Sequence, residues 1–309
     1  MKKTYLLIVA VFAILASLGV IVYSLFHFRV INTGVTEKNY YIELDNAGSA
    51  GKAVGNTAVV SVFASDNSTR WDFSDDEDVA RRKQFLGYID VAADYIEKCA
   101  DEWDKSISFF YAEDENSDLY YEAFFDIECV DMKMAIKKSA PVQWEYINNN
   151  IDVETIKEKY SCENVIFLMF INTEQGSEIN SFALTTYDEE MAYPYEICFI
   201  SRYYYDDPAS PSVIAHEMLH VFGAPDLYAY DSYGINYNVW LDFISYCQEN
   251  VPNDLMLTTF DKETGVRLTD KITNEISEIT AYYIGWLDTA PAEIDEYRLV
   301  HSQHERKKD

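Results

Sequence analysis

The stretch IAHEMLHVFGAPDLY, residues 214–228, contains residue types that can bind a transition metal and activate water. His216 and His220 are four positions apart, so on a helix their side chains project from one face and can share one ion. Glu217 lies between them in sequence, where a carboxylate can accept a proton from a water molecule beside the metal. The other three of the five histidines lie near the termini (His27, His301 and His304). This arrangement predicts a zinc site rather than a helix with two incidental histidines.

The third ligand of the predicted site must be something other than histidine. A catalytic zinc ion usually takes three protein ligands and keeps one position for water. Gly223 predicts the end of the helix, after which the chain can turn and bring Asp226 towards the metal. Glu249 is the alternative ligand, although no helical spacing favours it. Tyr228 could polarise a substrate carbonyl, but it is one of 25 tyrosines in the chain.

A family resemblance is carried by the same residues. HEMLHVFGAPD resembles the extended H-E-x-x-H-x-x-G-x-x-H/D motif of the metzincin clan of zinc peptidases. Its continuation G-A-P-D-L-Y is similar to a segment of bacterial peptidases of the immune inhibitor A group. The resemblance implies that His216, His220 and Asp226 bind one catalytic Zn²⁺ ion and that Glu217 is the general base.

The resemblance also implies a methionine-containing turn beneath the zinc site. Met256, in the sequence PNDLML, is the candidate for this turn, although a single loop methionine is usually a core residue. Leu257 and Thr258 follow it, where some metzincins have a tyrosine. IGWLD (284–288), after a helix expected from about residue 270, is similar to a segment near the end of such domains. The motifs span roughly residues 210–290, and upstream of them the likeness is only architectural.

The elements that must position these residues can be predicted from capping and periodicity. Ser210 can cap the histidine-bearing helix, and Pro211 fits its first position. A long helix should follow the acidic run DFSDDED (72–78), because its apolar residues alternate steps of four and three (Phe85, Ile89, Ala92, Ile96, Cys99 and Trp103). The acidic run favours a helix N-terminus. Ca²⁺ binding is the alternative, but the turn glycine and the regular ligand spacing are missing.

Short apolar and β-branched runs predict the strands, and a further helix is expected within residues 142–160. The runs are TAVVSVFA (57–64), SISFFYA (106–112), LYYEAFFDIECV (119–130), NVIFLMFI (164–171) and YEICFIS (195–201). The last of these, just before the histidine-bearing helix, could offer an edge to an extended peptide. The order predicts a mixed α/β or α+β domain. Together with the resemblance, it implies an α+β, metzincin-like domain with a mixed sheet, a long N-terminal helix and an active-site helix.

The N-terminal segment predicts a membrane anchor. Residues 5–26 form an apolar segment without a charged residue, and this segment is long enough to cross a bilayer. Lys2 and Lys3 precede it. The positive charges place residues 1–4 in the cytoplasm and the rest of the chain outside. Residues 27–56 are expected to form a stalk or lead-in, and residues 57–309 the peptidase domain. If the segment is instead a cleaved signal, the protein is secreted.

The net charge bears on which molecules the protein can bind, and the cysteines bear on whether it has disulfides. The net charge of −29, from 53 acidic and 24 basic residues, argues against nucleic acid, which needs a clustered basic surface. The five cysteines form no C-x-x-C pair, and both free thiols and disulfides remain open (Cys99, Cys129, Cys162, Cys198 and Cys247). The oligomeric state is also left open.

The sequence therefore predicts an extracytoplasmic, membrane-anchored zinc endopeptidase that acts on a protein or peptide substrate. Two alternatives are a surface binding module with a structural metal and a zinc amidase that acts on cell-wall peptides. Glu217 favours the enzymes over the binding module, because a structural site needs no base beside an open coordination position.

Overall fold

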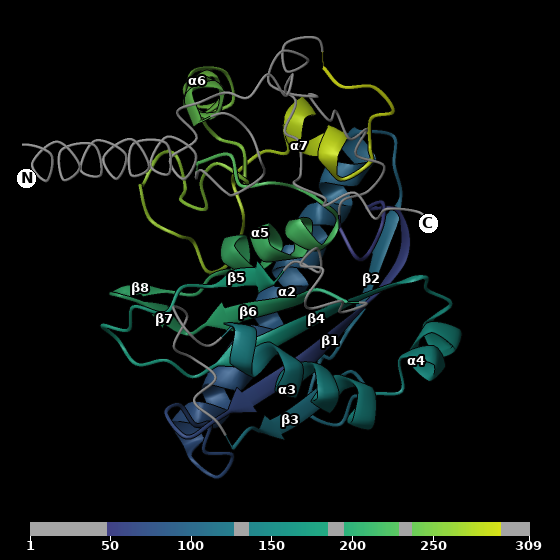
Figure 1. The fold of residues 1–309 in the computed structure, drawn as a ribbon, viewed down its shortest axis with the longest axis vertical. Coiled ribbons are helices and arrows are strands. Elements are labelled where there is room, and N and C mark those ends of the chain that lie inside the picture. The colour runs from purple at the N-terminus through teal and green to yellow at the C-terminus, as the bar shows by residue number, and fades with distance from the viewer. Residues whose placement is uncertain (1–47, 127–135, 185–194, 229–236, 292–309) are drawn as a thin grey trace, which may run out of the picture. The chain divides into compact units, whose positions relative to one another are not determined.

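The computed structural model describes residues 48–126, 136–184, 195–228 and 237–291, all within one compact unit (Figure 1). The predicted membrane segment, residues 5–26, lies outside these ranges. In the part of the chain that is described, no helix is long and apolar enough to span a membrane.

A mixed six-stranded sheet forms the centre of this unit. The long strand β1 (Gly55–Ser65) pairs in parallel with β2 and β3 along one edge and with β4 along the other. Strand β6 is parallel to β4, and β5 closes the sheet as an antiparallel neighbour of β6. The bounds are β2 (Ile107–Tyr111), β3 (Tyr120–Phe124), β4 (Asn164–Ile171), β5 (Phe182–Leu184) and β6 (Ile197–Ser201). A small hairpin follows, made of β7 (Tyr203–Tyr204) and β8 (Asp207–Pro208).

Helices cover both faces of the sheet, which is why β1 and β4 are buried along almost their whole length (Figure 1). On one face, the rings of Phe170 in β4 and Phe85 in α2 pack with their centroids 4.9 Å apart. On the same face, the Cys198 thiol of β6 donates a hydrogen bond to the Glu217 carbonyl of α5. On the other face, Gln143 of α3 lies beside Met169. The bounds are α2 (Asp76–Glu102), α3 (Ile136–Asn150), α4 (Val153–Tyr160), α5 (Pro211–Val221), α6 (Tyr237–Asn250) and α7 (Glu278–Tyr283).

Helix α2 forms where the sequence predicts it. The Asp75 carboxylate caps its N-terminus by accepting from the backbone N–H groups of Glu77 and Asp78, and three acidic residues occupy the first turn. The expected apolar face is buried at Phe85 and its successors up to Ile96, while Cys99 is partly buried. Trp103 follows the last helical residue as the C-cap.

Several element predictions need correction. The helix expected within residues 142–160 is two helices, which are separated at Ile151 and Asp152. The helix expected from about residue 270 is only α7, and α6 was not predicted. The strand at 195–201 is not an edge, because β6 lies between β4 and β5. The part of the 119–130 run beyond residue 126 lies outside the described residues.

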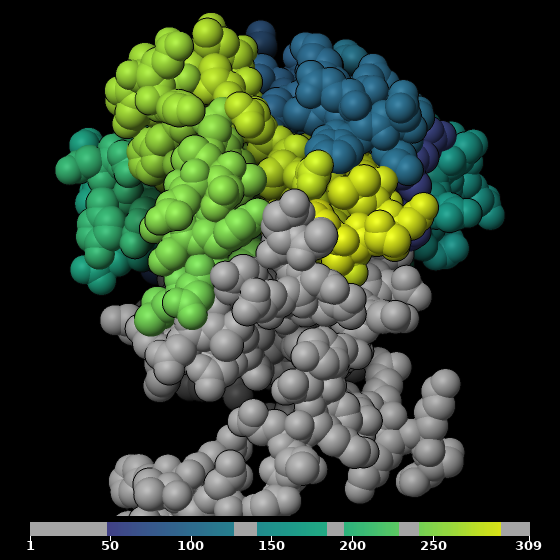
Figure 2. Space-filling model, turned by 90° about the horizontal axis from the view of Figure 1, so that it is seen from above, coloured from purple at the N-terminus to yellow at the C-terminus, as the bar shows by residue number. Residues whose placement is uncertain are grey.

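The chain after α5 covers the side of that helix facing away from the sheet. Every residue of α5 except His220 is buried, so the helix is enclosed except beside His220. Figure 2 shows the green and yellow surface of α6 and of the following residues beside the blue surface of α2. Helix α5 is therefore a central element that can present side chains to an internal site.

Candidate metal centre

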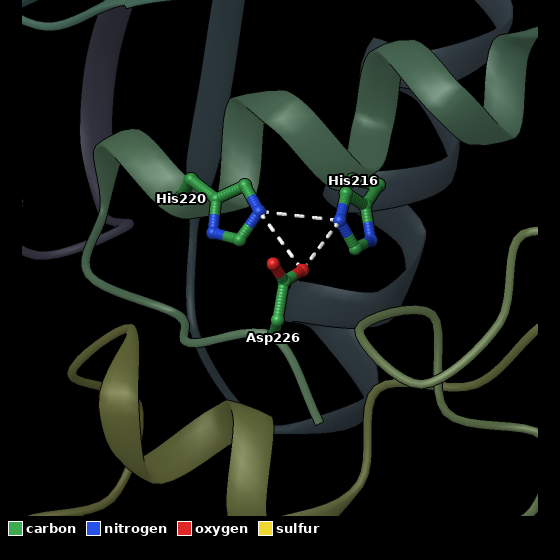
Figure 3. A group of neighbouring side chains, drawn as sticks. All are labelled: His216, His220 and Asp226. Carbon is green, nitrogen blue, oxygen red and sulfur yellow. Dashed lines mark hydrogen bonds and ion pairs between the residues drawn. The ribbon is translucent and has the colours of Figure 1, made fainter. Parts of the chain in front are cut away.

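Helix α5 holds the two predicted histidine ligands side by side. The Ser210 hydroxyl accepts a hydrogen bond from the Val213 N–H, and Pro211 occupies the first turn, as expected. His216 and His220 are one turn apart, and their Nε2 atoms are 3.1 Å apart. Their rings are edge to face with centroids 4.7 Å apart. The helix thus points both Nε2 atoms at one point in space (Figure 3).

The turn at Gly223 delivers Asp226 to the same point. Gly223 has a φ of 103°, a conformation that glycine adopts without strain, and its N–H donates to the His220 carbonyl. The chain then reverses, so that Asp226 Oδ1 lies 3.1 Å from His216 Nε2 and 3.3 Å from His220 Nε2 (Figure 3). The predicted third ligand is therefore brought to the two histidines.

The other nitrogen of each imidazole is tied to the backbone. His216 Nδ1 lies 3.0 Å from the Leu255 carbonyl, and His220 Nδ1 lies 2.7 Å from the Ala224 carbonyl. Because a carbonyl oxygen only accepts, each Nδ1 carries the proton and donates it. With Nδ1 donating, Nε2 of each ring faces the common point and is the nitrogen available to a metal ion once its proton is displaced.

This donor set fits a divalent transition metal. The ligand atoms of His216, His220 and Asp226 all lie within 4.8 Å of one another. Zinc–nitrogen bonds of about 2.0–2.1 Å in tetrahedral geometry place ligand atoms about 3.3 Å apart, close to the separations of 3.1–3.3 Å here. Burial alone lowers the pKa of His220, but the Asp226 carboxylate outweighs burial and raises that pKa to about 10. The cluster therefore favours positive charge at its centre, which a cation supplies.

Glu217 is a buried carboxylate next to this cluster. Glu217 is 4% exposed, and its Oε2 atom has no hydrogen-bond partner among the described residues. Burial raises the pKa of Glu217, while the charges of His216 and His220 oppose that rise. A carboxylate of this kind can exchange a proton with a molecule that occupies the site.

Met256 lies in a turn directly against the centre. The turn is closed by the Leu257 and Thr258 N–H groups, which both donate to the Asp254 carbonyl at 3.0 Å. Met256 is fully buried, and its carbonyl accepts from the Leu227 N–H next to Asp226. The same turn carries the Leu255 carbonyl that orients His216. The turn that contains Met256 is thus in contact with both ligand-bearing segments.

Asp254 holds this turn and was not found from the sequence. Its buried carboxylate accepts from the N–H groups of Met256 at 2.7 Å and Ser277 at 2.9 Å. It also accepts from the Thr280 hydroxyl at 2.8 Å. The available signal was local: an aspartate that accepts from the N–H two residues later is a common turn former.

The two weaker candidates lie in different places. The Tyr228 ring lies 6.0 Å from the His216 ring and is inclined to it by 29°, with about half of its surface exposed. It is therefore positioned at the mouth of the centre. Glu249 is exposed near the end of α6 and is not part of the metal-ligand cluster found among the described residues. The structure thus favours Asp226 over Glu249 as the third ligand.

The segment that precedes β1 also supports the centre. The Ala50 N–H donates to the Val221 carbonyl at 3.0 Å. Ser49 and Glu196 exchange two hydrogen bonds, because the Ser49 N–H donates to Glu196 Oε2 and the Glu196 N–H donates to the Ser49 hydroxyl. Residues 48–56, which were expected in a lead-in, are therefore packed into the domain, and the expected boundary at residue 57 lies inside β1. Glu196 could have been noticed as a single charge within an apolar run.

The four described cysteines are free thiols, and Cys129 lies outside the described residues. Comparison with known proteins adds no relative: no protein-family model matches the chain, and no curated protein matches it.

Proposed function

We propose that this protein is a zinc-dependent endopeptidase of the metzincin type, similar to the immune inhibitor A group. The observation that carries the proposal is the convergence of two imidazole nitrogens and one carboxylate oxygen beside a buried glutamate. His216, His220 and Asp226 would hold the zinc ion, and Glu217 would be the general base. The H-E-x-x-H-x-x-G-x-x-D pattern and the buried Met256 turn support the metzincin assignment.

A catalytic role is favoured over a structural one by the number of ligands. Structural zinc sites are closed by four protein ligands, whereas catalytic sites use three and keep a position for water or substrate. The cluster among the described residues offers three. The partnerless Oε2 atom of Glu217 also argues for catalysis, since a buried acceptor without a partner costs folding free energy and is retained where chemistry needs it.

Each residue of the centre has a separate role in the proposed reaction. A zinc ion held by His216, His220 and Asp226 would supply a Lewis acid for the scissile carbonyl and would lower the pKa of bound water towards neutrality. Glu217 takes a proton from the attacking water at Oε2 and passes it to the nitrogen of the departing amine. The Leu255 and Ala224 carbonyls keep the two imidazole rings in the required tautomer and orientation.

The substrate is proposed to be an extended protein or peptide segment. Strand β5 is the last strand of the sheet beside β6, and it contacts α5. An extended chain could add to this edge through main-chain hydrogen bonds and pass in front of the histidines. The proposed location is extracytoplasmic, with a membrane anchor at residues 5–26, and it rests on the apolar segment and on Lys2 and Lys3.

The test compares two glutamate variants of the full-length chain. Glu217→Gln removes the base but preserves the shape of the side chain, and the exposed Glu249→Gln is the matched control. We expect Glu217→Gln to keep bound zinc and to lose about 10²–10⁴-fold in kcat for casein or peptide cleavage. Glu249→Gln should match the wild type in both zinc content and rate.

Two outcomes would contradict the proposal. One is a wild-type protein that binds zinc stoichiometrically yet cleaves no peptide, which would favour a structural metal. The other is a Glu217→Gln variant with undiminished activity. Cleavage of cell-wall peptides without cleavage of proteins would instead indicate an amidase.

Asp226→Ala should lower zinc affinity, measured by competition with a chelator.

A further inference from the structure

The guanidinium group of Arg267 is connected through Thr259 to the first turn of α5, the helix that carries His216 and His220. Ser212 and His216 are four residues apart, so they lie on the same face of α5. The Ser212 hydroxyl donates to the Thr259 carbonyl at 2.7 Å. The Thr259 hydroxyl in turn accepts from Arg267 Nε at 2.9 Å. Arg267 is therefore linked through Thr259 to the first turn of α5, one helical turn before His216.

Arg267 also lies close to the mouth of the centre. Its guanidinium is within electrostatic reach of Tyr228, whose ring faces the His216 ring at 6.0 Å. The side chain of Arg267 is 17% exposed, so it is not sealed from solvent. A group bound beside Tyr228 can therefore meet this cation.

The guanidinium is fixed in place but is only loosely paired. Its central carbon lies 4.3 Å from the centre of the Phe260 ring, and Nε is used by Thr259. Among the described residues, the carboxylate that pairs with it is Asp207, 3.7 Å from Nη1, on a side chain that is 53% exposed. This separation is longer than a hydrogen bond, so Asp207 does not saturate the guanidinium. The Nη groups keep donors for a second carboxylate, which arginine binds in a bidentate manner.

We propose that Arg267 determines substrate specificity by binding an acidic side chain close to the scissile bond. The inference rests on the proposed peptidase function and names the substrate class. One helical turn advances about 5.4 Å, and an extended peptide advances about 3.3 Å per residue. Since Arg267 lies a further residue away from α5, through Thr259, the aspartate or glutamate of the substrate is expected within about three residues of the scissile bond. In a chain with a net charge of −29, a local cation is also needed to retain an acidic ligand.

The test uses peptides that are identical except for glutamate, glutamine or lysine at one of the three positions on either side of the cleaved bond. At one position we expect kcat/KM for the wild type to be about tenfold higher with glutamate than with glutamine, a difference of about 1.4 kcal/mol, because arginine binds a carboxylate more strongly than an amide. Lysine should give the lowest value. Arg267→Gln should bring the ratio of glutamate to glutamine to about one. Binding of the same peptides to Glu217→Gln should show the same preference without turnover.

Two further variants keep the test independent of the folding of Arg267→Gln. Asp207→Asn removes the competing carboxylate and should increase the preference for glutamate. Arg82→Gln removes a guanidinium that lies 4.3 Å from the Phe73 ring, in a different hollow beside residues 113–116, and should leave the preference unchanged. Equal cleavage of the glutamate and glutamine peptides at every position overturns the inference and leaves the peptidase function standing. Absence of cleavage of all peptides overturns both.

Discussion

The imidazoles of His216 and His220 each use both nitrogens. Nδ1 donates to a backbone carbonyl, and Nε2 faces the neighbouring histidine and the carboxylate of Asp226. The backbone bonds fix the tautomer, so no side chain has to rearrange before a metal ion binds. At the residue scale, the centre is therefore already organised for coordination.

Glu196 gives a pH-dependent prediction at this scale. Burial raises the pKa of Glu196 to about 8, although the Ser49 hydrogen bonds and the nearby His220 oppose that rise. The folded-state pKa of Glu196 is above the usual value of 4.5. The contribution of this carboxyl group to the free energy of unfolding is therefore complete below pH 4.5 and is lost as the pH rises towards 8. Glu196→Gln keeps an acceptor for Ser49 and never becomes charged. Its Tm relative to the wild type should therefore rise between pH 5 and pH 9.

The control for this measurement is Glu249→Gln, which alters an exposed side chain. Its Tm difference from the wild type should stay constant over the same range. A Tm difference for Glu196→Gln that is flat, or that falls as the pH rises, would show that the buried carboxyl does not destabilise the folded protein at high pH.

The residues of the centre differ in how far the sequence predicts them. His216, Glu217, His220 and Asp226 lie within one helix and one turn, so spacing and a glycine suffice to predict their convergence. Glu196 was not predicted, because its partner Ser49 is 147 residues away. The Leu255 and Ala224 carbonyls are backbone groups, which carry no signal in the residue type.

At the element scale, the C-terminal end of α5 is held by the segment before β1. A Cβ atom at Gly48 would lie 2.0 Å from the Val221 carbonyl oxygen and 2.5 Å from the Gly223 nitrogen. Only glycine permits this approach, which brings the segment against the turn leading to Asp226. The packing of residues 48–53 is therefore coupled to the position of the third ligand.

Gly48→Ala should consequently destabilise the protein and weaken zinc binding. The clash is with backbone atoms, so the segment or the turn at Gly223 must shift. We expect a loss of about 1–3 kcal/mol in the free energy of unfolding, the usual cost of overpacking. Chemical denaturation measures the loss, and a chelator competition assay measures the zinc affinity.

Gly87→Ala is the matched control on α2. Gly87 is exposed within the helix, and a Cβ atom there would meet nothing within 4 Å. Alanine should stabilise the protein by about 0.5–1 kcal/mol, because glycine is unfavourable inside helices. Equal stability of Gly48→Ala and the wild type would contradict the close approach at Gly48.

Elements with a strong local pattern were predicted best. Strand β4 has the predicted bounds, because a continuous apolar run is typical of a strand buried on both faces. Helix α6 was not predicted, since its aromatic and β-branched residues have modest helix propensity and its buried positions, Phe243 and Cys247, need tertiary contacts. Near residue 270, Asn274 bonds to the Thr258 carbonyl, so tertiary contacts replace a helix there.

At the scale of the whole molecule, the metal should connect the parts that surround α5. The cluster joins α5 to the turn at Asp226, and through Leu255 and Met256 to the chain that ends in α7. A ligand that binds only the folded state stabilises it by mass action. Zinc should therefore raise the stability of the folded protein as a unit.

Removal of zinc tests this expectation. With free zinc at about 1,000 times its Kd, binding contributes about 4.1 kcal/mol, so EDTA should lower Tm by about 8–16 °C in a domain of this size. The His216→Ala, His220→Ala double variant should show no response to EDTA. A wild-type Tm that is equal with and without EDTA would mean that the metal does not link these segments.

The most direct test of the zinc centre is an anomalous difference map of the zinc-loaded protein, recorded at the zinc absorption edge. The account predicts one peak about 2.0–2.2 Å from His216 Nε2, His220 Nε2 and an oxygen of Asp226, with no fourth protein ligand. No peak at this position, or a fourth protein side chain that closes the coordination, would contradict a catalytic zinc centre.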